Sequence, residues 1–284
     1  MIPSKFEYHR AGSINEALQL LAQNGPDAKI LAGGHSLLPA MKLRFNNPAV
    51  LIDIGSIPDL SYIRKENGTL AIGAATTHAE LAASDLIAST IPVLSEAAAT
   101  IGDVQVRNKG TIGGSIAHAD PAADWPAALL ATDAEIVISG SSGNRSVAVI
   151  DFFQGLFTTD LGDNELITEI RVPIPPANTR SAYLKFEQPA SRFAIVGCAA
   201  VVTQNGGICE HVRVAFTGVS ATPFRDREVE QALEGKAPDE QALDAASGHA
   251  AEEVEVMGDH FASRDYRRHL AKVYAKRALR AVTS

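Results

Sequence analysis

The sequence predicts an α+β protein, and three features of its 284 residues carry the prediction. Strand-like and helical patterns alternate through residues 1–55, hairpin-forming and helical patterns are mixed over residues 56–176, and long strand-like runs followed by helices fill residues 177–284. The segment PIPPANTR at 173–180 is typical of a linker, because its prolines cannot pair along a strand. We therefore expect one domain over residues 1–176, made of a small α/β subdomain and a larger α+β subdomain, and a C-terminal domain of three-stranded antiparallel sheet and helices.

The small subdomain is expected to contain strands separated by helices. Ser13 is a candidate N-cap and Gly25 a helix stop for the pattern INEALQLLAQNG, while the apolar run AKILAGG ends in two glycines, as a buried strand entering a turn does. Ser36 is a candidate N-cap for the second helix, which tolerates Pro39 in its first turn. The expected elements are helix 14–25, strand 28–34, helix 36–45 and strand 49–55.

The rest of the chain alternates between helical patterns and strand-like runs. Two strand-like runs separated by GSSGN predict a hairpin, and NGG at 205–207 marks a turn between two later strands. Helices are expected from Glu228 onwards. The expected elements before that point are strand 69–77, helices 78–90 and 91–102, and strands 134–139, 145–152, 165–175, 182–187, 194–204 and 209–219.

Composition and charge restrict the class of protein. The longest apolar run, 194–202, is too short to cross a membrane, and the first residues show no apolar signal core, so we expect a soluble, cytoplasmic protein. The net charge of −8 argues against a nucleic-acid partner. The two cysteines, Cys198 and Cys209, are too few for an iron-sulfur cluster and are expected to be buried thiols.

The segment 264–280 departs from this acidic average, since it carries seven Lys or Arg residues and one Asp. Leu270, Val273, Tyr274 and Leu279 recur among these charges at helical spacing. This pattern favours an amphipathic helix with a solvated basic face. The alternative is a docking surface for an acidic partner subunit.

Two glycine pairs share one design, in LAGGHSLL at 31–38 and TIGGSIAH at 111–118. In each, a strand-like approach ends in Gly-Gly and a small polar residue opens the next segment. Glycines at such a turn let backbone N–H groups approach a ligand closely, and a helix start adds free donors and a positive dipole end. Either pair alone is weak evidence, because most Gly-Gly pairs are tight turns. Together they predict a cradle for the two phosphates of a pyrophosphate.

Other common motifs are missing from these segments. Neither loop fits the phosphate loop of NTPases or the Gly-x-Gly-x-x-Gly fingerprint. Leu38 stands where a hydrolase nucleophile elbow around Ser36 requires glycine. His118 and Asp120 have no second ligand cluster to support a metal site. The sequence therefore predicts no metal ligand and no catalytic acid–base pair.

Three charged residues near the second loop are candidate ligand contacts. Asp124 precedes the apolar helix WPAALLA; near a phosphate it would repel, so facing a ligand it should meet hydroxyl groups, as acidic residues do on ribose. The alternative is a carboxylate that stabilises a helix start. Arg107 and Lys109 either offset pyrophosphate charge or lie in a solvated turn.

At these residues the chain resembles the medium, FAD-binding subunit of molybdenum hydroxylases, the carbon monoxide dehydrogenase and xanthine dehydrogenase group. The resemblance rests on four motifs in order, AGGHSLLPAMKLR, VQVRNKGTIGGSIAHADPAADWPAALLA, ELITEIRVP and YLKFEQPASRFAIVGCAAVV, and extends to the C-terminal RDYRRHLAKVYAKRAL. It implies a two-part FAD-binding domain of the vanillyl-alcohol oxidase (PCMH) type, followed by the C-terminal sheet and helices.

The resemblance also implies roles for individual residues around a noncovalent FAD. Both glycine loops wrap its pyrophosphate, Asp124 takes a ligand hydroxyl, and Ile101 and Ile167 line the cofactor. Lys185 lies beside the flavin, where a cation favours its reduced, anionic form, and Phe193 lies near the ring. Many relatives carry Gln at His35 or Asn at Ser115, so side-chain contacts differ there. The loop residues implied to bind FAD are Leu31, Ala32, Gly33, Gly34, His35, Ser36, Leu37, Thr111, Ile112, Gly113, Gly114 and Ser115.

The function implied by the resemblance is electron transfer. A large subunit with molybdopterin oxidises the substrate, a small subunit with [2Fe-2S] clusters passes electrons on, and the FAD of this chain delivers them to an external acceptor, in a dimer of heterotrimers. The two cysteines agree with clusters held by another chain. Flavin chemistry needs position and electronics rather than an acid–base dyad. Two alternatives stay open: a free-standing FAD-dependent oxidoreductase, and a non-redox nucleotide-binding module.

Overall fold

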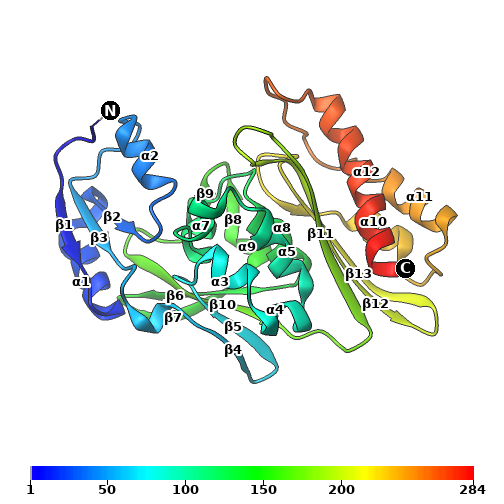
Figure 1. Ribbon diagram of the computed structural model, residues 1–284, viewed down its shortest axis with the longest axis horizontal. Helices are drawn as coiled ribbons and strands as arrows, with labels where there is room; N and C mark the ends of the chain where they lie inside the picture. The colour runs from blue at the N-terminus through cyan, green and yellow to red at the C-terminus, as the bar shows by residue number, and fades with distance from the viewer. Residues whose placement is uncertain (1) are drawn as a thin grey trace.

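The computed structural model describes residues 2–284, which form three successive structural units along the long axis of the molecule (Figure 1). The N-terminal unit is built on a parallel sheet, the central unit on an antiparallel sheet with helices, and the C-terminal unit on a second antiparallel sheet with helices. This mixture of elements confirms the α+β fold class.

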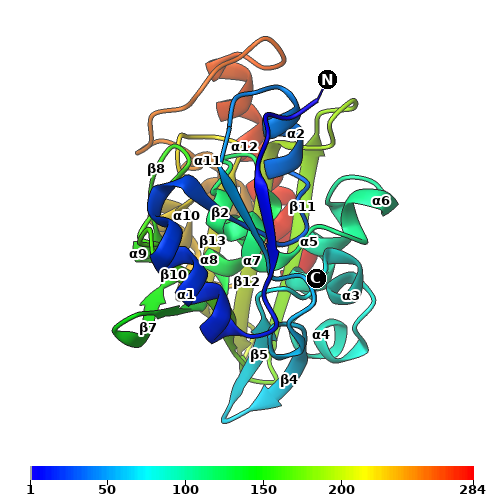
Figure 2. The ribbon, with the colours of Figure 1, turned by 90° about the vertical axis from the view of Figure 1, so that its left-hand side faces the viewer.

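The N-terminal unit has a three-stranded sheet in the order β1-β3-β2, with all neighbours parallel. Figure 2 views this unit from its outer side, with β1 and α1 towards the viewer. Ser13 caps α1 as predicted, accepting a hydrogen bond from Glu16 N (3.2 Å). Ser36 precedes the second helix but makes no capping hydrogen bond, which corrects the prediction. The elements are β1 Glu7–Arg10, α1 Ile14–Asn24, β2 Ala28–Leu31, α2 Leu37–Lys42 and β3 Val50–Asp53.

The central unit carries a five-stranded antiparallel sheet in the order β4-β5-β10-β6-β7. Apolar side chains of β5, β6 and β10 form one large core with the helices, and Trp125 is its largest fully buried side chain. The helix expected over 78–90 is two helices, because Ser84 starts a new one by capping Ile87 N. The strands are β4 Ile63–Glu66, β5 Thr69–Gly73, β6 Glu135–Gly140, β7 Gly143–Ala148, β8 Phe153–Gly155, β9 Thr158–Thr159 and β10 Glu165–Pro173; the helices are α3 His78–Ala82, α4 Asp85–Thr90, α5 Pro92–Thr100, α6 Val104–Arg107, α7 Ile112–His118, α8 Asp124–Ala131 and α9 Val149–Phe152.

The C-terminal unit has three long antiparallel strands, as predicted, and a two-residue fourth strand at the edge. Helix α12 packs on β11 and β12, while α5 and α8 of the central unit also pack against this sheet. Cys198 and Cys209 are buried and free, and burial raises the pKa of both thiols. The elements are β11 Thr179–Glu187, β12 Ala194–Asn205, β13 Ile208–Thr217, β14 Phe224–Arg225, α10 Arg227–Leu233, α11 Glu240–Gly248 and α12 Arg264–Thr283.

Several of the basic side chains of α12 pair with carboxylates of the same chain. Lys276 pairs with Glu240 of α11 at 2.7 Å, and Lys272 pairs with Glu252 at 3.3 Å. The opposite side of the helix is buried through Leu270 and other apolar residues. These contacts favour the amphipathic-helix interpretation of this segment over a docking surface.

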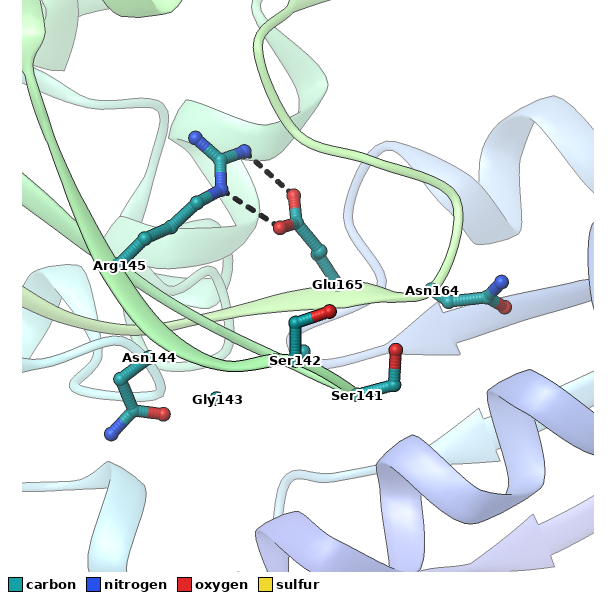
Figure 3. Close-up of a pocket in the computed structure, with 8 residues that line it drawn as sticks. Ser141, Ser142, Gly143, Asn144, Arg145, Asn164 and Glu165 are labelled. Atoms are coloured by element: carbon teal, nitrogen blue, oxygen red, sulfur yellow. Dashed lines mark hydrogen bonds and ion pairs between the residues drawn. The ribbon is translucent and has the colours of Figure 1, made fainter.

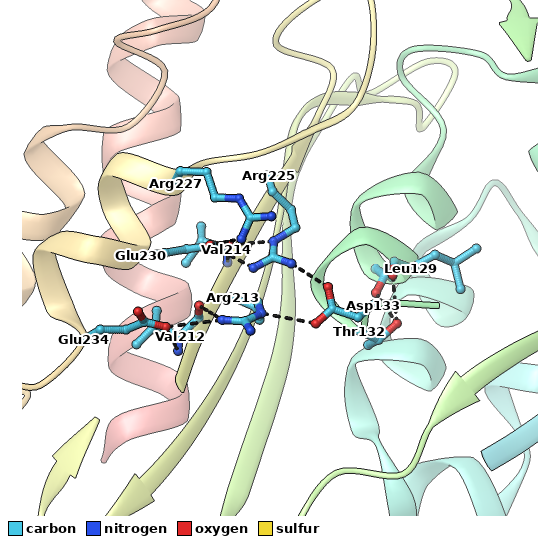
Figure 4. Close-up of polar contacts among 11 residues, drawn as sticks. Leu129, Thr132, Asp133, Val212, Arg213, Val214, Arg225, Arg227, Glu230 and Glu234 are labelled. Carbon is cyan, nitrogen blue, oxygen red and sulfur yellow. Dashed lines mark hydrogen bonds and ion pairs between the residues drawn. The ribbon is translucent and has the colours of Figure 1, made fainter. Parts of the chain in front are cut away.

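Polar contacts hold the C-terminal unit against the central one. Asp133, which follows α8, lies between Arg213 and Arg225 of the C-terminal sheet (Figure 4). Arg225 in turn makes two hydrogen bonds to Glu230 (2.9 and 2.8 Å), and both of these side chains are buried. Nearer the site described below, Gly218 N donates to Pro121 O (2.7 Å). The two units are therefore fixed relative to each other on both sides of α8.

The described part of the chain has neither a membrane-spanning helix nor a metal-binding cluster. Across residues 2–284, no helix combines the length and the hydrophobicity that spanning a bilayer requires. The same residues contain no group of three or more His, Cys, Asp or Glu side chains placed to hold a metal ion.

Candidate functional site

The first glycine loop joins β2 to α2 and presents an uninterrupted row of free backbone donors. The N–H groups of residues 32–37 find no hydrogen-bond acceptor among residues 2–284; the next N–H along the chain, that of Leu38, donates to Gly34 O at 3.0 Å. Gly34 has φ of +73°, a conformation that favours glycine. None of these residues is fully buried. Consecutive free N–H groups of this kind form a concave site for an anion. We call residues 32–37 the N–H loop.

The second glycine loop is arranged differently from the prediction. The first three N–H groups of α7 are already used: Ile112 N donates to Thr76 O (3.1 Å), Gly113 N to Ala74 O (2.9 Å) and Gly114 N to the Thr111 hydroxyl (3.2 Å). The expectation that this helix start supplies free donors is therefore wrong. The cause is twofold: segment 74–77 lies beside the loop and accepts from Ile112 N and Gly113 N, a contact that no local sequence pattern reveals, and the Thr111 side chain accepts from Gly114 N.

The two glycine loops nevertheless meet in space. A Cβ atom on Gly33 would lie 2.1 Å from Lys109 O and 2.7 Å from Gly110 Cα, so only glycine permits this approach. Gly114 is exposed, and a Cβ built on it would lie 3.9 Å from the Cβ of Ala32. The second loop therefore supports the N–H loop and closes its side. The Ser115 residue, one position further along α7, is half-buried.

Cationic groups around the loops divide into engaged and free ones. Arg107 donates through Nη1 to the carbonyls of Ile101 and Gly102, both at 3.0 Å, so it holds the end of α5 in place. Lys109 is exposed and makes no salt bridge within residues 2–284. Its backbone carbonyl is the atom that Gly33 approaches. Of the two cations considered from the sequence, Lys109 is the one available to an anion.

Asp124 lies at the first residue of α8 and is 4% exposed. Its Oδ2 accepts from Lys185 Nζ at 2.9 Å, and its Oδ1 accepts from the Tyr183 hydroxyl at 2.5 Å. Lys185 Nζ also donates to Thr100 O at 3.0 Å. Burial raises the pKa of Asp124, while the Lys185 charge and the Tyr183 hydrogen bond oppose the rise. The structure thus joins Asp124 and Lys185 in one buried ion pair between the central and C-terminal units.

Tyr183 was not among the residues singled out from the sequence. It lies two residues before Lys185 on β11, so both side chains leave the same face of the strand. Gly197, on the neighbouring strand, makes room for it, because a Cβ there would lie 2.2 Å from the Tyr183 hydroxyl oxygen. Burial and the Asp124 carboxylate raise the pKa of Tyr183, which stays a hydrogen-bond donor. In the sequence, the only indication of its role was the two-residue spacing from Lys185, which places both side chains on one face of a strand.

The apolar candidates lie in different environments. Ile101 ends α5, is half-buried and packs against the central core. Ile167 is 3% exposed in β10, inside that core. Phe193 is 44% exposed, next to Arg192, whose Nη1 donates to Gly102 O (3.4 Å). The structure therefore brings the segment around Phe193 close to the end of α5 that carries Ile101.

A separate hollow lies at the turn between β6 and β7 (Figure 3). Arg145 and Glu165 face each other across it with two hydrogen bonds of 2.8 and 2.7 Å, and Arg145 also pairs with Asp160. These bonds commit the guanidinium and both carboxylates to each other. Since none of the glycine-loop residues lines this hollow, we do not regard it as part of the site.

Comparisons with known proteins agree with this geometry. The family model "FAD binding domain in molybdopterin dehydrogenase" matches residues 4–175, and "CO dehydrogenase flavoprotein C-terminal domain" matches residues 181–282. The chain is 45% identical to the carbon monoxide dehydrogenase medium chain of Hydrogenophaga pseudoflava, covering 99% of this chain and 98% of that one. It is 38% identical to the glyceraldehyde dehydrogenase medium chain of Sulfolobus acidocaldarius, covering 99% and 100%.

The solved structures give the same result. A carbon monoxide dehydrogenase from Hydrogenophaga pseudoflava that lacks the Mo-pyranopterin moiety of its molybdenum cofactor contains a chain that matches with a TM-score of 0.96 and 46% identity, over 99% of this chain and 98% of that chain. The resemblance inferred from the four motifs and the fold inferred with it are confirmed. The chain belongs to the FAD-binding medium subunits of the carbon monoxide dehydrogenase and xanthine dehydrogenase family, and is the flavoprotein subunit of an oxidoreductase.

Proposed function

We propose that the N–H loop binds the FAD pyrophosphate and that the chain carries electrons from partner-held [2Fe-2S] clusters to an external acceptor. The observation that carries this proposal is the row of six free N–H groups over residues 32–37, closed on one side by the second glycine loop. A diphosphate needs many donors at short range, and backbone donors free of Cβ atoms supply them. The residues present therefore fit the dinucleotide that the family model names.

Each part of the site has a separate task in this proposal. The N–H loop holds the phosphates, and the exposed Lys109 lies at its edge, where its backbone meets Gly33. The Asp124 carboxylate has lone pairs beyond those that accept from Tyr183 and Lys185, and one of them accepts a hydrogen bond from a cofactor hydroxyl group. The Lys185 ammonium pairs with Asp124 at the boundary between the two units, where it stabilises added negative charge. When bound, FAD supplies a ring that takes up and releases electrons.

We further propose that the chain works in a complex with a large molybdopterin subunit and a small [2Fe-2S] subunit, assembled as a dimer of heterotrimers. Ile101 and Ile167 are proposed to line the cofactor, together with the loop residues Leu31 to Leu37 and Thr111 to Ser115. Support comes from the relatives, which are medium chains of dehydrogenases, and from the cysteine content, which leaves no cluster ligands on this chain.

The test compares two substitutions at one glycine in the assembled complex. Gly114→Asp places a carboxylate beside the N–H loop, whereas Gly114→Asn places a neutral group of nearly the same size there. We expect the aspartate variant to lose FAD at least about tenfold more readily, because charge repulsion adds to bulk. Noncovalent FAD released on denaturation is measured by absorbance. Equal flavin content in both variants would show that no phosphate of the cofactor lies near Gly114.

Electron transfer is tested on the complex that contains the Gly114→Asp variant, which we expect to be depleted of FAD. Substrate should still reduce the [2Fe-2S] clusters, followed by their absorbance, while reduction of the external acceptor stops. Transfer to the acceptor at the full rate without FAD would contradict the proposed role. An isolated chain that oxidises a substrate by itself would favour a free-standing oxidoreductase. Bound flavin that the reduced clusters never reduce would favour a nucleotide-binding module.

A further inference from the structure

One buried hydrogen bond connects the side of the site that carries the glycine loops with helix α8, which carries Asp124. His78 begins α3, and Trp125 follows Asp124 in α8. The Trp125 indole Nε1 donates to His78 Nδ1 at 3.1 Å, with the two rings 6.0 Å apart between centroids. Trp125 is fully buried and His78 is 4% exposed. Neither side chain is among those expected to bind the cofactor.

The direction of this hydrogen bond fixes the state of His78. An indole nitrogen only donates, so Nδ1 of His78 is the acceptor and its proton is on Nε2. Burial, and then electrostatic repulsion from His35 and Arg107, lower the pKa of His78 to about 4. The imidazole is therefore neutral near pH 7, which keeps the Nδ1 lone pair available to Trp125.

The other side of His78 supports the second glycine loop. Its backbone N donates to Gly110 O at 2.9 Å, and its Nε2 lies 2.7 Å from the position of a Cβ on Gly110. The same segment, Lys109 and Gly110, meets Gly33 of the N–H loop on another side. The imidazole thus lies against the piece of chain on which the N–H loop rests.

We propose that His78 and Trp125 are a positioning pair for FAD, which sets the spacing between the N–H loop and the Asp124 helix. This inference rests on the proposed function. A dinucleotide must be met at its phosphates and at a hydroxyl group simultaneously, so a fixed spacing between the two contacts favours binding. Neither side chain needs to touch the cofactor.

The experiment uses three single variants of the full chain, expressed with its partner subunits. Trp125→Phe removes the donor, His78→Leu removes the acceptor, and His78→Asn keeps an acceptor, because its Oδ1 takes the place of Nδ1. We expect the first two to weaken FAD binding about tenfold, the effect of one buried hydrogen bond, and the asparagine variant to stay within about threefold of the wild type. Because the partners touch, the Trp125→Phe/His78→Leu double variant should lose less than the product of the single effects.

Two measurements separate positioning from general stability. FAD affinity is measured by titrating the flavin-free protein, and the unfolding midpoint is measured on the flavin-free form. Trp125 is the only tryptophan of this chain, so with isotope label in this chain alone a single indole N–H resonance reports whether the bond persists in the wild type and in the two His78 variants. Unchanged FAD affinity, or a loss in His78→Asn equal to that in His78→Leu, would overturn the inference. A wild-type protein that binds no FAD would instead refute the proposed function, which keeps the two failures distinct.

Discussion

Alanine at Gly33 is expected to lower FAD affinity by about 10- to 100-fold, which corresponds to the roughly 1–3 kcal/mol that overpacking costs. The added Cβ would lie 2.1 Å from Lys109 O, closer than any real contact, and the nearby atoms belong to backbone that cannot rotate away. The N–H loop must then separate from the second loop. The measurement is the FAD dissociation constant of the flavin-free protein.

Gly248→Ala is the matched control for this prediction. Gly248 lies in α11, and a Cβ built there meets no atom within 4 Å. Because Gly248 is the last residue of α11, alanine there should change the free energy of unfolding by less than about 1 kcal/mol and leave FAD affinity unchanged. If Gly33→Ala binds FAD as tightly as Gly248→Ala, the approach of the two loops has no part in cofactor binding.

Removal of the Lys185 ammonium is expected to lower the free energy of unfolding by about 3–5 kcal/mol near neutral pH. Lys185→Met keeps most of the side-chain volume but leaves the Asp124 carboxylate buried without its counter-charge; both side chains are almost inaccessible, at 3% and 4%. Replacing both partners, in Lys185→Met/Asp124→Asn, should restore much of the loss because no buried charge remains. Chemical denaturation of the flavin-free protein measures each value.

The loss in Lys185→Met should also depend on pH. Burial raises the pKa of Asp124, and Lys185 opposes this, so the variant has a still higher folded-state pKa. A carboxyl group whose pKa is raised in the folded state binds more protons there than in the unfolded state. The free energy of unfolding therefore falls as the pH rises from the unfolded-state pKa through the folded-state pKa. The variant should therefore be less destabilised at about pH 5 than at about pH 8. Lys272→Met, which breaks an exposed pair with Glu252, is the control and should cost less than about 1 kcal/mol. Equal losses in the two variants would contradict the account.

Much of the fold follows from local pattern, because most elements have clear periodicity and clear ends. Helix α1 lies between its Ser13 cap and Gly25, and the long apolar run of β12 matches the strand expected there. Strand β1, with the polar sequence EYHR, was missed because its pairing with β3 depends on residues more than 40 positions away. The break between α3 and α4 was missed because an apolar helical pattern continues across it.

The candidate site was only partly predictable, for a similar reason. Gly-Gly pairs indicate places where the backbone closely approaches another segment or a ligand, and Gly33 does approach Lys109 and Gly110. Which N–H groups stay free is largely a tertiary property: segment 74–77 accepts from Ile112 N and Gly113 N of α7, while no segment within residues 2–284 accepts from the N–H groups of residues 32–37. The partners of Asp124 likewise come from a strand some 60 residues later, which no spacing rule connects to it.

A structure of the assembled complex with FAD bound tests the central claim most directly. We expect the pyrophosphate oxygens to lie about 2.7–3.2 Å from backbone nitrogens of the N–H loop, with the second glycine loop beside them contributing side-chain or van der Waals contacts. A diphosphate bound elsewhere, with the N–H groups of residues 32–37 facing only water, would contradict the account.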